Sequence, residues 1–202
     1  MKILIDVDGV VLDWESAFDE WMSLQGFRIK KQGIYDQYKR YGFQRKKQCD
    51  ELVSKFNNSA WIGYLKPLRD SHIFLPQLKR EGFSFDAITS LSEDKYAGQL
   101  RKYNLEQVFG VNTFDRVLCI GTGADKDEAL AEYEPGHWWV EDKPKNAEAG
   151  LKAGHKPILI SHTWNEDYTT DGIQKVNNWP KRWWTIRSPR WRPNSRQLRL
   201  AR

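Results

Sequence analysis

The chain has 202 residues, of which 40% are hydrophobic, so it is long enough for one domain with a sizeable core or for a core with a small insertion. No stretch approaches the roughly 20 apolar residues of a membrane span, and the first residues predict a strand instead of a secretory signal segment. The two cysteines show neither a disulfide framework nor metal-ligand spacing. We therefore expect a cytoplasmic protein of a size that suits an enzyme.

The net charge of +5 is unevenly distributed along the chain. Residues 1–174 hold 23 basic and 27 acidic residues, whereas residues 175–202 hold nine basic and no acidic residues. This tail also carries four tryptophans: Trp179, Trp183, Trp184 and Trp191. Basic side chains interleaved with aromatic ones are typical of segments that bind nucleic acid. The alternative is that the tryptophans pack the tail against the body or against another subunit of an oligomer.

Apolar runs alternate with helical patterns along most of the chain, which is typical of a mostly parallel sheet with helices on its faces. The expected strands are residues 2–7, 83–89, 116–120, 137–140 and 156–160. The expected crossover helices are residues 71–81, 93–103, 125–133 and 145–153. The sequence therefore predicts an α/β fold with a mostly parallel sheet.

Residues 14–70 break this alternation, because they are rich in aromatic residues and lysine and show helical patterning. They predict a small helical insertion after the first strand. Ligands bind beyond the carboxyl ends of the strands in open parallel sheets, so this insertion would cover a site as a cap. The alternative is a helical layer without a role in binding. The predicted organisation is a core of residues 1–13 and 71–165, a cap of residues 14–70 and a basic, Trp-rich extension of residues 166–202.

The first predicted strand ends in two aspartates, Asp6 and Asp8, which are followed by Gly9. The apolar residues before them explain a buried strand, but they do not explain two carboxylates at its end. An unpaired buried charge is costly, so such carboxylates need a cation, a proton or hydrogen-bond donors. The pair is therefore a candidate functional site.

Three further strand ends supply complementary chemistry at the same predicted edge of the sheet. The second strand ends in Thr89 and Ser90, whose hydroxyl and backbone N–H groups suit a phosphate oxygen. Lys126 follows the third strand in a glycine-containing turn, and Glu141 and Asp142 follow the fourth. Each signal is weak alone, but their occurrence at four successive strand ends indicates a phosphate-binding catalytic site.

These residues resemble the four motifs of the haloacid dehalogenase (HAD) superfamily of phosphohydrolases. The motifs are Asp6-Val7-Asp8-Gly9-Val10, Thr89-Ser90, Lys126 and Glu141-Asp142. The resemblance extends from residue 1 to about residue 160 and implies a HAD-like Rossmannoid three-layer core. Residues 6–14, 61–68 and 88–90 are further similar to the 5′(3′)-deoxyribonucleotidase branch of the superfamily.

The resemblance implies that Asp6 is a nucleophile that forms an aspartyl-phosphate, with Mg²⁺ offsetting the repulsion between carboxylate and phosphate dianion. Asp8 would protonate the leaving alkoxide and later deprotonate water, while its main-chain carbonyl binds the metal. An alcohol leaving group needs an acid, whereas a halide does not, so the presence of Asp8 disfavours dehalogenation. A phosphoryl mutase would also keep both aspartates. Asp142 would complete the metal site. Glu141 stands where an aspartate is commoner. It would either bind the metal itself or hold a residue that binds the metal.

The resemblance also assigns the phosphate-binding groups. Thr89 or Ser90 would bind phosphate oxygens, and Lys126 would neutralise charge on the nucleophile and the phosphoryl group. Lys95 and Lys143 also lie near predicted strand ends. Lys126 is preferred, because Lys95 is expected within a helix and Lys143 adjoins a predicted metal ligand.

The substrate is predicted from two tryptophans and the nucleotidase resemblance. Trp14 and Trp61 would contact the base or sugar of a nucleotide, or would instead belong to the interior of the cap. We expect a Mg²⁺-dependent phosphomonoesterase acting on nucleoside 5′-monophosphates, including deoxynucleotides. One alternative is a phosphatase for the ends of DNA or RNA that grips the polymer with residues 175–202. Another is a nucleic-acid-binding module on an inactive HAD core.

Overall fold

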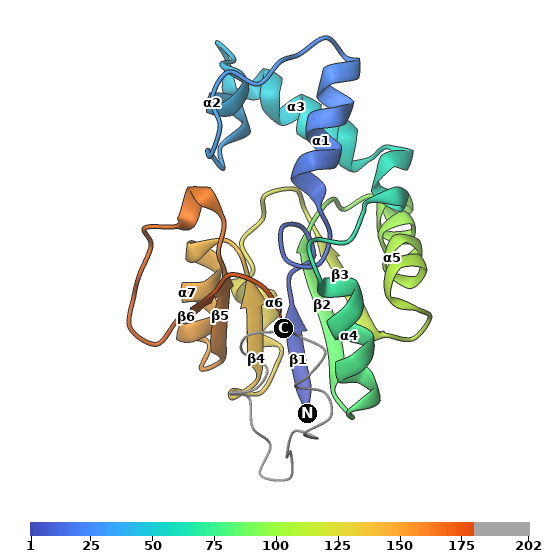
Figure 1. Cartoon of the computed structure of the whole chain (residues 1–202), viewed down its shortest axis with the longest axis vertical. Coiled ribbons are helices and arrows are strands. Elements are labelled where there is room, and N and C mark those ends of the chain that lie inside the picture. Colours follow the sequence, from blue (N-terminus) through green and yellow to red (C-terminus); the bar gives the residue numbers. More distant parts are fainter. Residues whose placement is uncertain (180–202) are drawn as a thin grey trace, which may run out of the picture.

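The computed structural model describes residues 1–179, which form a layered α/β core with a helical cap above one edge of the sheet (Figure 1). The strands are β1 (Lys2–Ile5), β2 (Ser84–Ser90), β3 (Phe114–Ile120), β4 (Trp138–Glu141), β5 (Lys156–Ile160) and β6 (Gln174–Val176). They pair in parallel in the order β3-β2-β1-β4-β5-β6. This arrangement confirms the predicted α/β fold.

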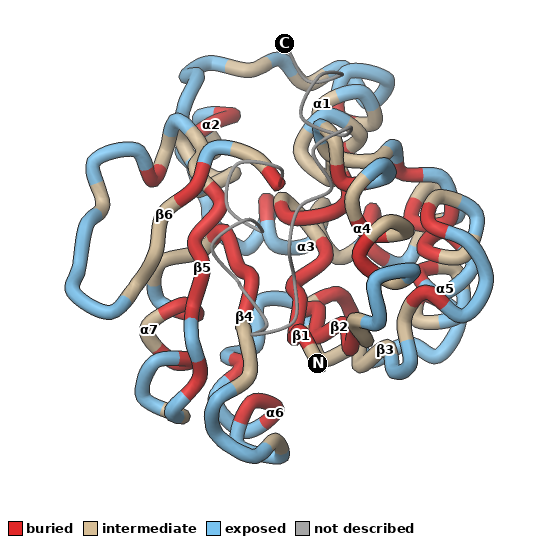
Figure 2. The backbone as a smooth tube through the Cα atoms, turned by 60° about the horizontal axis from the view of Figure 1, so that its bottom comes forward, coloured by how far each residue is buried: buried red, intermediate tan, exposed pale blue. Residues whose placement is uncertain are grey.

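Alternating side chains of β1 separate the core into two apolar layers. Ile3 and Ile5 pack with residues of α4 and α5, whereas Leu4 packs with Trp139 and with residues of α6 and α7. The helices of these layers are α4 (Ser71–Arg80), α5 (Lys95–Phe109), α6 (Asp127–Ala131) and α7 (Pro144–Lys152). The central strands are buried between them, which fixes the strand ends as the rigid frame of any site at that edge (Figure 2).

The cap consists of four short helical elements inserted between β1 and α4. They are α1 (Trp14–Leu24), α2 (Gln37–Tyr41), α3 (Lys46–Asn57) and the 3₁₀ helix η1 (Ala60–Tyr64). Asp13 caps α1 by accepting a hydrogen bond from the Ser16 N–H at 3.1 Å, so the first helix begins directly after the β1 loop. Phe18 and Phe56 are fully buried in the cap interior. Figure 1 shows the cap standing over the carboxyl ends of the strands.

The C-terminal part of the described chain belongs to the core to a greater extent than the sequence indicates. The short strand β6 extends the sheet, and a second 3₁₀ helix, η2 (Thr163–Asn165), lies between β5 and β6. Trp179 is 2% exposed, and its Nε1 donates to the Val10 carbonyl at 3.0 Å. The predicted nucleic-acid-binding tail lies outside the described residues from residue 180 onward. Within residues 1–179, none of the helices has the length and apolar character of a membrane span.

Candidate active site

The structure brings three of the predicted site residues into direct contact at the carboxyl ends of β1 and β4. The Lys126 ammonium lies between two carboxylates, with Nζ 2.6 Å from Asp6 Oδ1 and 2.9 Å from Glu141 Oε2. The Lys126 side chain is 1% exposed, so these ion pairs replace the water that the ammonium loses on burial. The turn after β3 therefore delivers Lys126 to the predicted edge of the sheet.

The charges of these three groups are strongly coupled. Burial alone would lower the pKa of Lys126, but the nearby charges of Asp6 and Glu141 outweigh it and raise that pKa. Burial would raise the pKa of Glu141, but the Lys126 charge and backbone hydrogen bonds reverse the shift and lower it. Burial and the charge of Glu141 raise the pKa of Asp6 well above its usual value. Lys126 therefore stays protonated and Glu141 ionised, whereas a cation would favour the charged form of Asp6.

Glu141 uses both of its carboxylate oxygens inside the protein. Oε1 accepts hydrogen bonds from the backbone N–H groups of Asp142, at 3.0 Å, and Lys143, at 2.9 Å. Oε2 accepts from Lys126 at 2.9 Å and from the Asn146 side chain at 3.3 Å. Glu141 therefore holds the loop after β4 and orients Lys126, which favours the supporting role over that of a direct metal ligand.

The donor set at this edge fits a small divalent cation. Ligand oxygens of Asp6, Glu141 and Asp142 lie within 4.8 Å of one another. The N–H of Val7, at 2.7 Å, and Lys126 both contact Asp6 Oδ1, so these two neighbours leave Oδ2 to a cation or a phosphoryl group. Burial, followed by the charges of Glu141 and Asp6, raises the pKa of Asp142. Hard carboxylate oxygens of this kind suit Mg²⁺.

Gly9 provides the close approach between the loop after β1 and the loop after β4. Its φ of +76° lies in the left-handed region, and a Cβ there would come within 2.1 Å of Asp142 Oδ2. Only a residue without a side chain fits this position without moving the Asp142 carboxylate. The glycine of the first motif therefore makes room beside a predicted metal ligand.

Asp8 has a partner that the sequence analysis missed. The Nη2 of Arg101, a fully buried residue of α5, donates to Asp8 Oδ2 at 2.8 Å and lies 2.7 Å from Oδ1. Burial raises the pKa of the Asp8 carboxyl, while the Arg101 charge opposes the shift. Asp8 thus has Arg101 as its ion-pair partner, and the Lys126 charge also opposes the rise in its pKa. The metal-binding role of its main-chain carbonyl stays a prediction.

The predicted phosphate-binding residues lie at the end of β2. Thr89 is fully buried, and its hydroxyl lies near the Asp8 carboxyl, where it opposes the rise in the Asp8 pKa that burial causes. Ser90 is less buried, and its hydroxyl donates to the Ala124 carbonyl at 2.9 Å in the loop that carries Lys126. Ser90 thus ties two site loops together, whereas Thr89 lies beside Asp8, and the binding of a phosphate oxygen by either residue stays a prediction.

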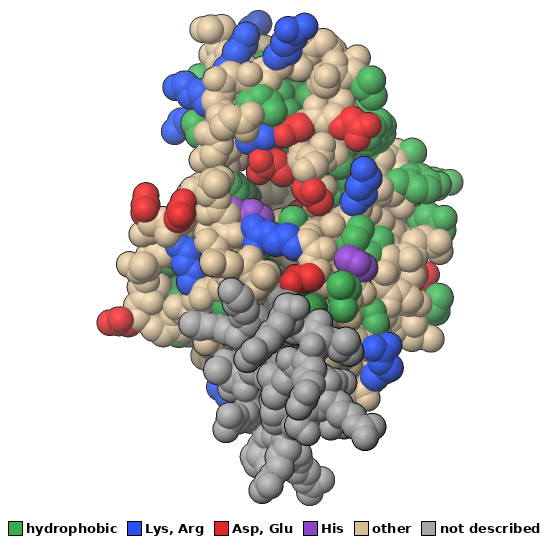
Figure 3. Space-filling view, viewed as in Figure 1, with side chains coloured by type: hydrophobic (Ala, Val, Ile, Leu, Met, Phe, Trp, Pro, Cys, Tyr) green, Lys and Arg blue, Asp and Glu red, His purple; other side chains and the backbone are tan. Residues whose placement is uncertain are grey.

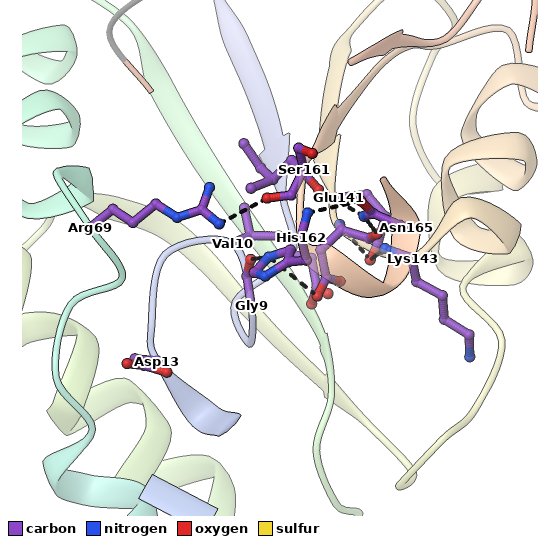
Figure 4. A network of polar contacts seen from close by, with 12 residues as sticks. Gly9, Val10, Asp13, Arg69, Glu141, Lys143, Ser161, His162 and Asn165 are labelled. Atoms are coloured by element: carbon purple, nitrogen blue, oxygen red, sulfur yellow. Dashed lines mark hydrogen bonds and ion pairs between the residues drawn. The ribbon is translucent and has the colours of Figure 1, made fainter. Parts of the chain in front are cut away.

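The two alternative lysines occupy other positions. Lys95 is the first residue of α5. Lys143 lies over the ring of Tyr35, with Nζ 5.7 Å from the ring centroid, and its side chain extends away from Glu141 (Figure 4). Lys126 is the lysine that contacts the Asp6 carboxylate, and its catalytic role stays a prediction.

Trp14 and Trp61, which are predicted to contact the base or sugar, each pack at least one face of the ring against other cap residues. Trp14 stacks on Phe18 with ring centroids 4.6 Å apart, and its Nε1 donates to Asn57 at 2.9 Å. Trp61 lies 6.4 Å from Phe56, between ring centroids. Both side chains are half-buried, so their contact with a base or sugar stays a prediction.

Two other aromatic residues connect the cap to the core beside the acidic cluster. Tyr35, in the cap loop before α2, contacts Trp164 of the core with ring centroids 4.6 Å apart. The Tyr35 residue is 47% exposed, but desolvation at its hydroxyl, followed by the charges of Asp142 and Glu141, raises the pKa of the phenol well above its usual value, which keeps it a hydrogen-bond donor. Figure 3 shows that the molecule is hollowed between the cap and the core, with acidic side chains at the edge of the hollow.

Comparison with known sequences gives one distant relative. No protein-family model matches the chain. An uncharacterised 32.4 kDa protein from the gp30–rIII intergenic region of Enterobacteria phage T4 is 25% identical over 188 residues. The match covers 88% of this chain but 66% of that relative, so the chain spans slightly less than two thirds of its length.

Comparison with solved structures identifies the fold. A haloacid dehalogenase-like hydrolase from Streptococcus pneumoniae matches with a TM-score of 0.60 and 14% identity, over 86% of this chain and 92% of that one. CbbY from Rhodobacter sphaeroides, solved in complex with phosphate, matches with a TM-score of 0.57 and 16% identity, over 86% and 92%. A CbbY mutant in complex with xylulose-1,5-bisphosphate matches with a TM-score of 0.59 and 16% identity, over 88% and 93%. The chain therefore has the fold of the HAD-type hydrolases.

Proposed function

We propose that the protein is a Mg²⁺-dependent phosphomonoesterase that acts on nucleoside 5′-monophosphates through an aspartyl-phosphate. The observation that carries this proposal is the position of Lys126 between Asp6 and Glu141, next to Asp142 at the carboxyl ends of the strands. A buried lysine held by two carboxylates offers a fixed positive charge for a phosphoryl group. The adjacent carboxylates offer a nucleophile and cation ligands.

The chemistry follows from the different ion-pair partners of the two aspartates, Lys126 for Asp6 and Arg101 for Asp8. One carboxylate oxygen of Asp6 attacks phosphorus while the bond between phosphorus and the leaving oxygen breaks, and Asp8 gives that oxygen a proton. Asp8 then takes a proton from the water that attacks the aspartyl-phosphate, which releases inorganic phosphate and restores Asp6. Lys126 neutralises charge near Asp6, and Thr89 donates to a phosphate oxygen. Mg²⁺ bound by Asp6 and Asp142 would reduce the repulsion between carboxylate and phosphate.

The nucleotide assignment is supported by two aromatic residues that connect the cap to the core. Tyr35 and Trp164 lie beside the acidic cluster, and aromatic faces stack on nucleobases for roughly 1 to 3 kcal/mol per base. The complexes of CbbY with phosphate and with a phosphosugar support a small phosphorylated substrate in general. A substrate panel must therefore include sugar phosphates as well as nucleotides.

The proposal is tested by measuring phosphate release from ribo- and deoxynucleoside 5′- and 3′-monophosphates, sugar phosphates and 5′-phosphorylated oligonucleotides. We expect hydrolysis of 5′-monophosphates with Mg²⁺, loss of activity with EDTA, and loss of activity in the Asp6→Asn variant. Turnover of sugar phosphates alone would contradict the nucleotide assignment while leaving the mechanism intact. Turnover of oligonucleotides alone would favour a polynucleotide-end phosphatase.

A further inference from the structure

The loop after β5 contacts both loops that carry the predicted metal ligands. Asn165, which is 3% exposed, uses its whole carboxamide on the backbone (Figure 4). Its Oδ1 accepts from the His162 N–H at 2.8 Å, and its Nδ2 donates to the carbonyls of Asp142, at 2.7 Å, and Ile160, at 2.9 Å. One side chain thus joins the loop after β5 to the loop of Asp142.

His162 extends this connection to the loop after β1. Its Nε2 lies 2.7 Å from the Gly9 carbonyl oxygen. A carbonyl oxygen only accepts, so Nε2 carries the hydrogen and donates it. The imidazole also stacks on Trp164, with ring centroids 5.4 Å apart and planes at 11°, which fixes the direction of the donor. His162 therefore holds the turn that follows the predicted nucleophile.

The loop after β5 is itself anchored at both ends. The Nη2 of Arg69 donates to the Ser161 carbonyl at 2.8 Å, as Figure 4 shows. The Lys175 ammonium donates to the carbonyls of Asn165, at 2.6 Å, and Tyr168, at 3.0 Å. These bonds make the loop a fixed support, so His162 and Asn165 are able to hold the two ligand-bearing loops.

Such support matters because the ligand-bearing loops approach each other closely while their carboxylates repel. Gly9 leaves no space for a side chain beside Asp142, and carboxylate oxygens of Asp6, Glu141 and Asp142 lie within 4.8 Å of one another. We propose that His162 and Asn165 are positioning residues that set the separation of these two loops and thereby the affinity for Mg²⁺. The inference rests on the proposed function for its choice of cation. Neither side chain is assigned a bond to the cation or to the substrate.

The test is the affinity for Mg²⁺ of the full-length protein, measured by isothermal titration calorimetry without substrate. His162→Phe keeps a ring to stack on Trp164 but removes the donor to Gly9. We expect Mg²⁺ affinity to fall at least about tenfold, because groups that orient metal ligands typically contribute 10- to 100-fold. His162→Gln, which retains a side-chain N–H at similar reach, should recover most of the affinity.

A matched control is available in His155. This buried histidine also contacts a main-chain carbonyl, with Nε2 3.1 Å from Leu130 O. It precedes β5, whereas Gly9 follows the parallel strand β1, so the two residues lie at opposite edges of the sheet. His155→Phe should therefore leave Mg²⁺ affinity within twofold of the wild type, even if it lowers the melting temperature. Asn165→Ala, which removes the bond to Asp142, should weaken Mg²⁺ binding as His162→Phe does, and it provides the test if His162→Phe does not fold.

The outcomes separate this inference from the proposed function. Folded His162→Phe and Asn165→Ala variants that bind Mg²⁺ as tightly as the wild type would overturn the inference, whatever the activity. In a phosphate-release assay the variants should need at least about tenfold more Mg²⁺ for half-maximal rate, with kcat largely restored at saturating Mg²⁺. Absence of phosphate release in the wild type would overturn the proposed function, and the calorimetric comparison would still decide the role of His162 and Asn165.

Discussion

Arg101 holds the carboxylate of Asp8 from within the core. Its Nη2 lies 2.7 and 2.8 Å from the two Asp8 oxygens, and the Arg101 side chain is fully buried while Asp8 is 23% exposed. The carboxylate therefore faces the site on one side and a fixed cation on the other. The arrangement orients the proposed acid and base.

We expect Arg101→Met to lower kcat for phosphomonoesters by about 100-fold or more, because correctly placed proton transfer contributes roughly 10²- to 10⁴-fold. KM should change less, since Arg101 touches Asp8 and not the phosphate. Arg101→Lys should be intermediate, because an ammonium keeps the charge but lacks the planar guanidinium. Steady-state kinetics at saturating Mg²⁺ measure both effects.

The control for Arg101 is its neighbour Lys102, an exposed residue whose Nζ is 3.9 Å from Glu106. Lys102→Met should leave kcat unchanged. Removal of one partner from a buried ion pair also costs stability, so thermal melting must show that Arg101→Met is folded at the assay temperature. A folded Arg101→Met variant with the kcat of the wild type would show that Asp8 needs no partner.

Gly9→Ala should abolish Mg²⁺ binding, because the added methyl group would come within 2.1 Å of Asp142 Oδ2 and displace that carboxylate. Gly26 offers a matched control. Its φ of +83° imposes similar backbone strain on an alanine, but a Cβ there meets nothing within 4 Å. Calorimetric titration of both variants with Mg²⁺ separates the steric effect from the strain. Equal Mg²⁺ affinities of the Gly9→Ala and Gly26→Ala variants would contradict the steric argument.

The strand-end residues could be predicted from the sequence because parallel strands share one carboxyl edge. Asp6, Lys126 and Glu141 follow separate apolar runs, so the fold class alone brings them to the same edge of the sheet. Arg101 could not be found in this way. An arginine within an amphipathic helix usually points to solvent, and its burial depends on how α5 packs against the loop of Asp8.

The C-terminal contacts were hidden for a related reason. The segment Gln174–Val176 is short and has little apolar pattern, so the sixth strand gives no clear sequence signal. His162 and Asn165 are isolated polar residues after a strand, and they gain meaning only from the carbonyl groups that they contact. The sequence reveals charged residues at positions where apolar residues are expected. Hydrogen bonds to backbone groups far along the chain become visible only in the folded structure.

Mg²⁺ binding should release protons and should strengthen as the pH rises. Burial and the charge of Glu141 raise the pKa of both Asp6 and Asp142, so the metal-free protein retains protons that ligation must displace. Calorimetry in buffers of different ionisation enthalpy counts the protons released. An affinity independent of pH between the ordinary carboxyl range and neutrality would contradict the assignment of these two ligands.

The same pKa shifts predict how stability depends on pH. A carboxyl whose pKa is raised on folding contributes stability that is present below its unfolded pKa and lost as the pH rises through the folded value. With EDTA, the melting temperature should therefore decline over that interval. Mg²⁺ should oppose the decline, with a stabilisation of about 2.7 kcal/mol at one hundred times its Kd. The increase in melting temperature that Mg²⁺ causes should therefore grow toward neutral pH. An increase that shrinks toward neutral pH would contradict the prediction.

Tyr35→Ala should distinguish a nucleoside from other leaving groups. If a base stacks beside the contact between Tyr35 and Trp164, loss of the ring should raise KM for nucleoside 5′-monophosphates about tenfold, since a stacked base contributes roughly 1 to 3 kcal/mol. KM for glycerol phosphate, which has no ring, should change little. Tyr64→Ala is the control, because that exposed cap tyrosine pairs with Tyr103 instead. An equal rise in KM for both substrates would mean that Tyr35 closes the cap over any phosphomonoester without reading the base.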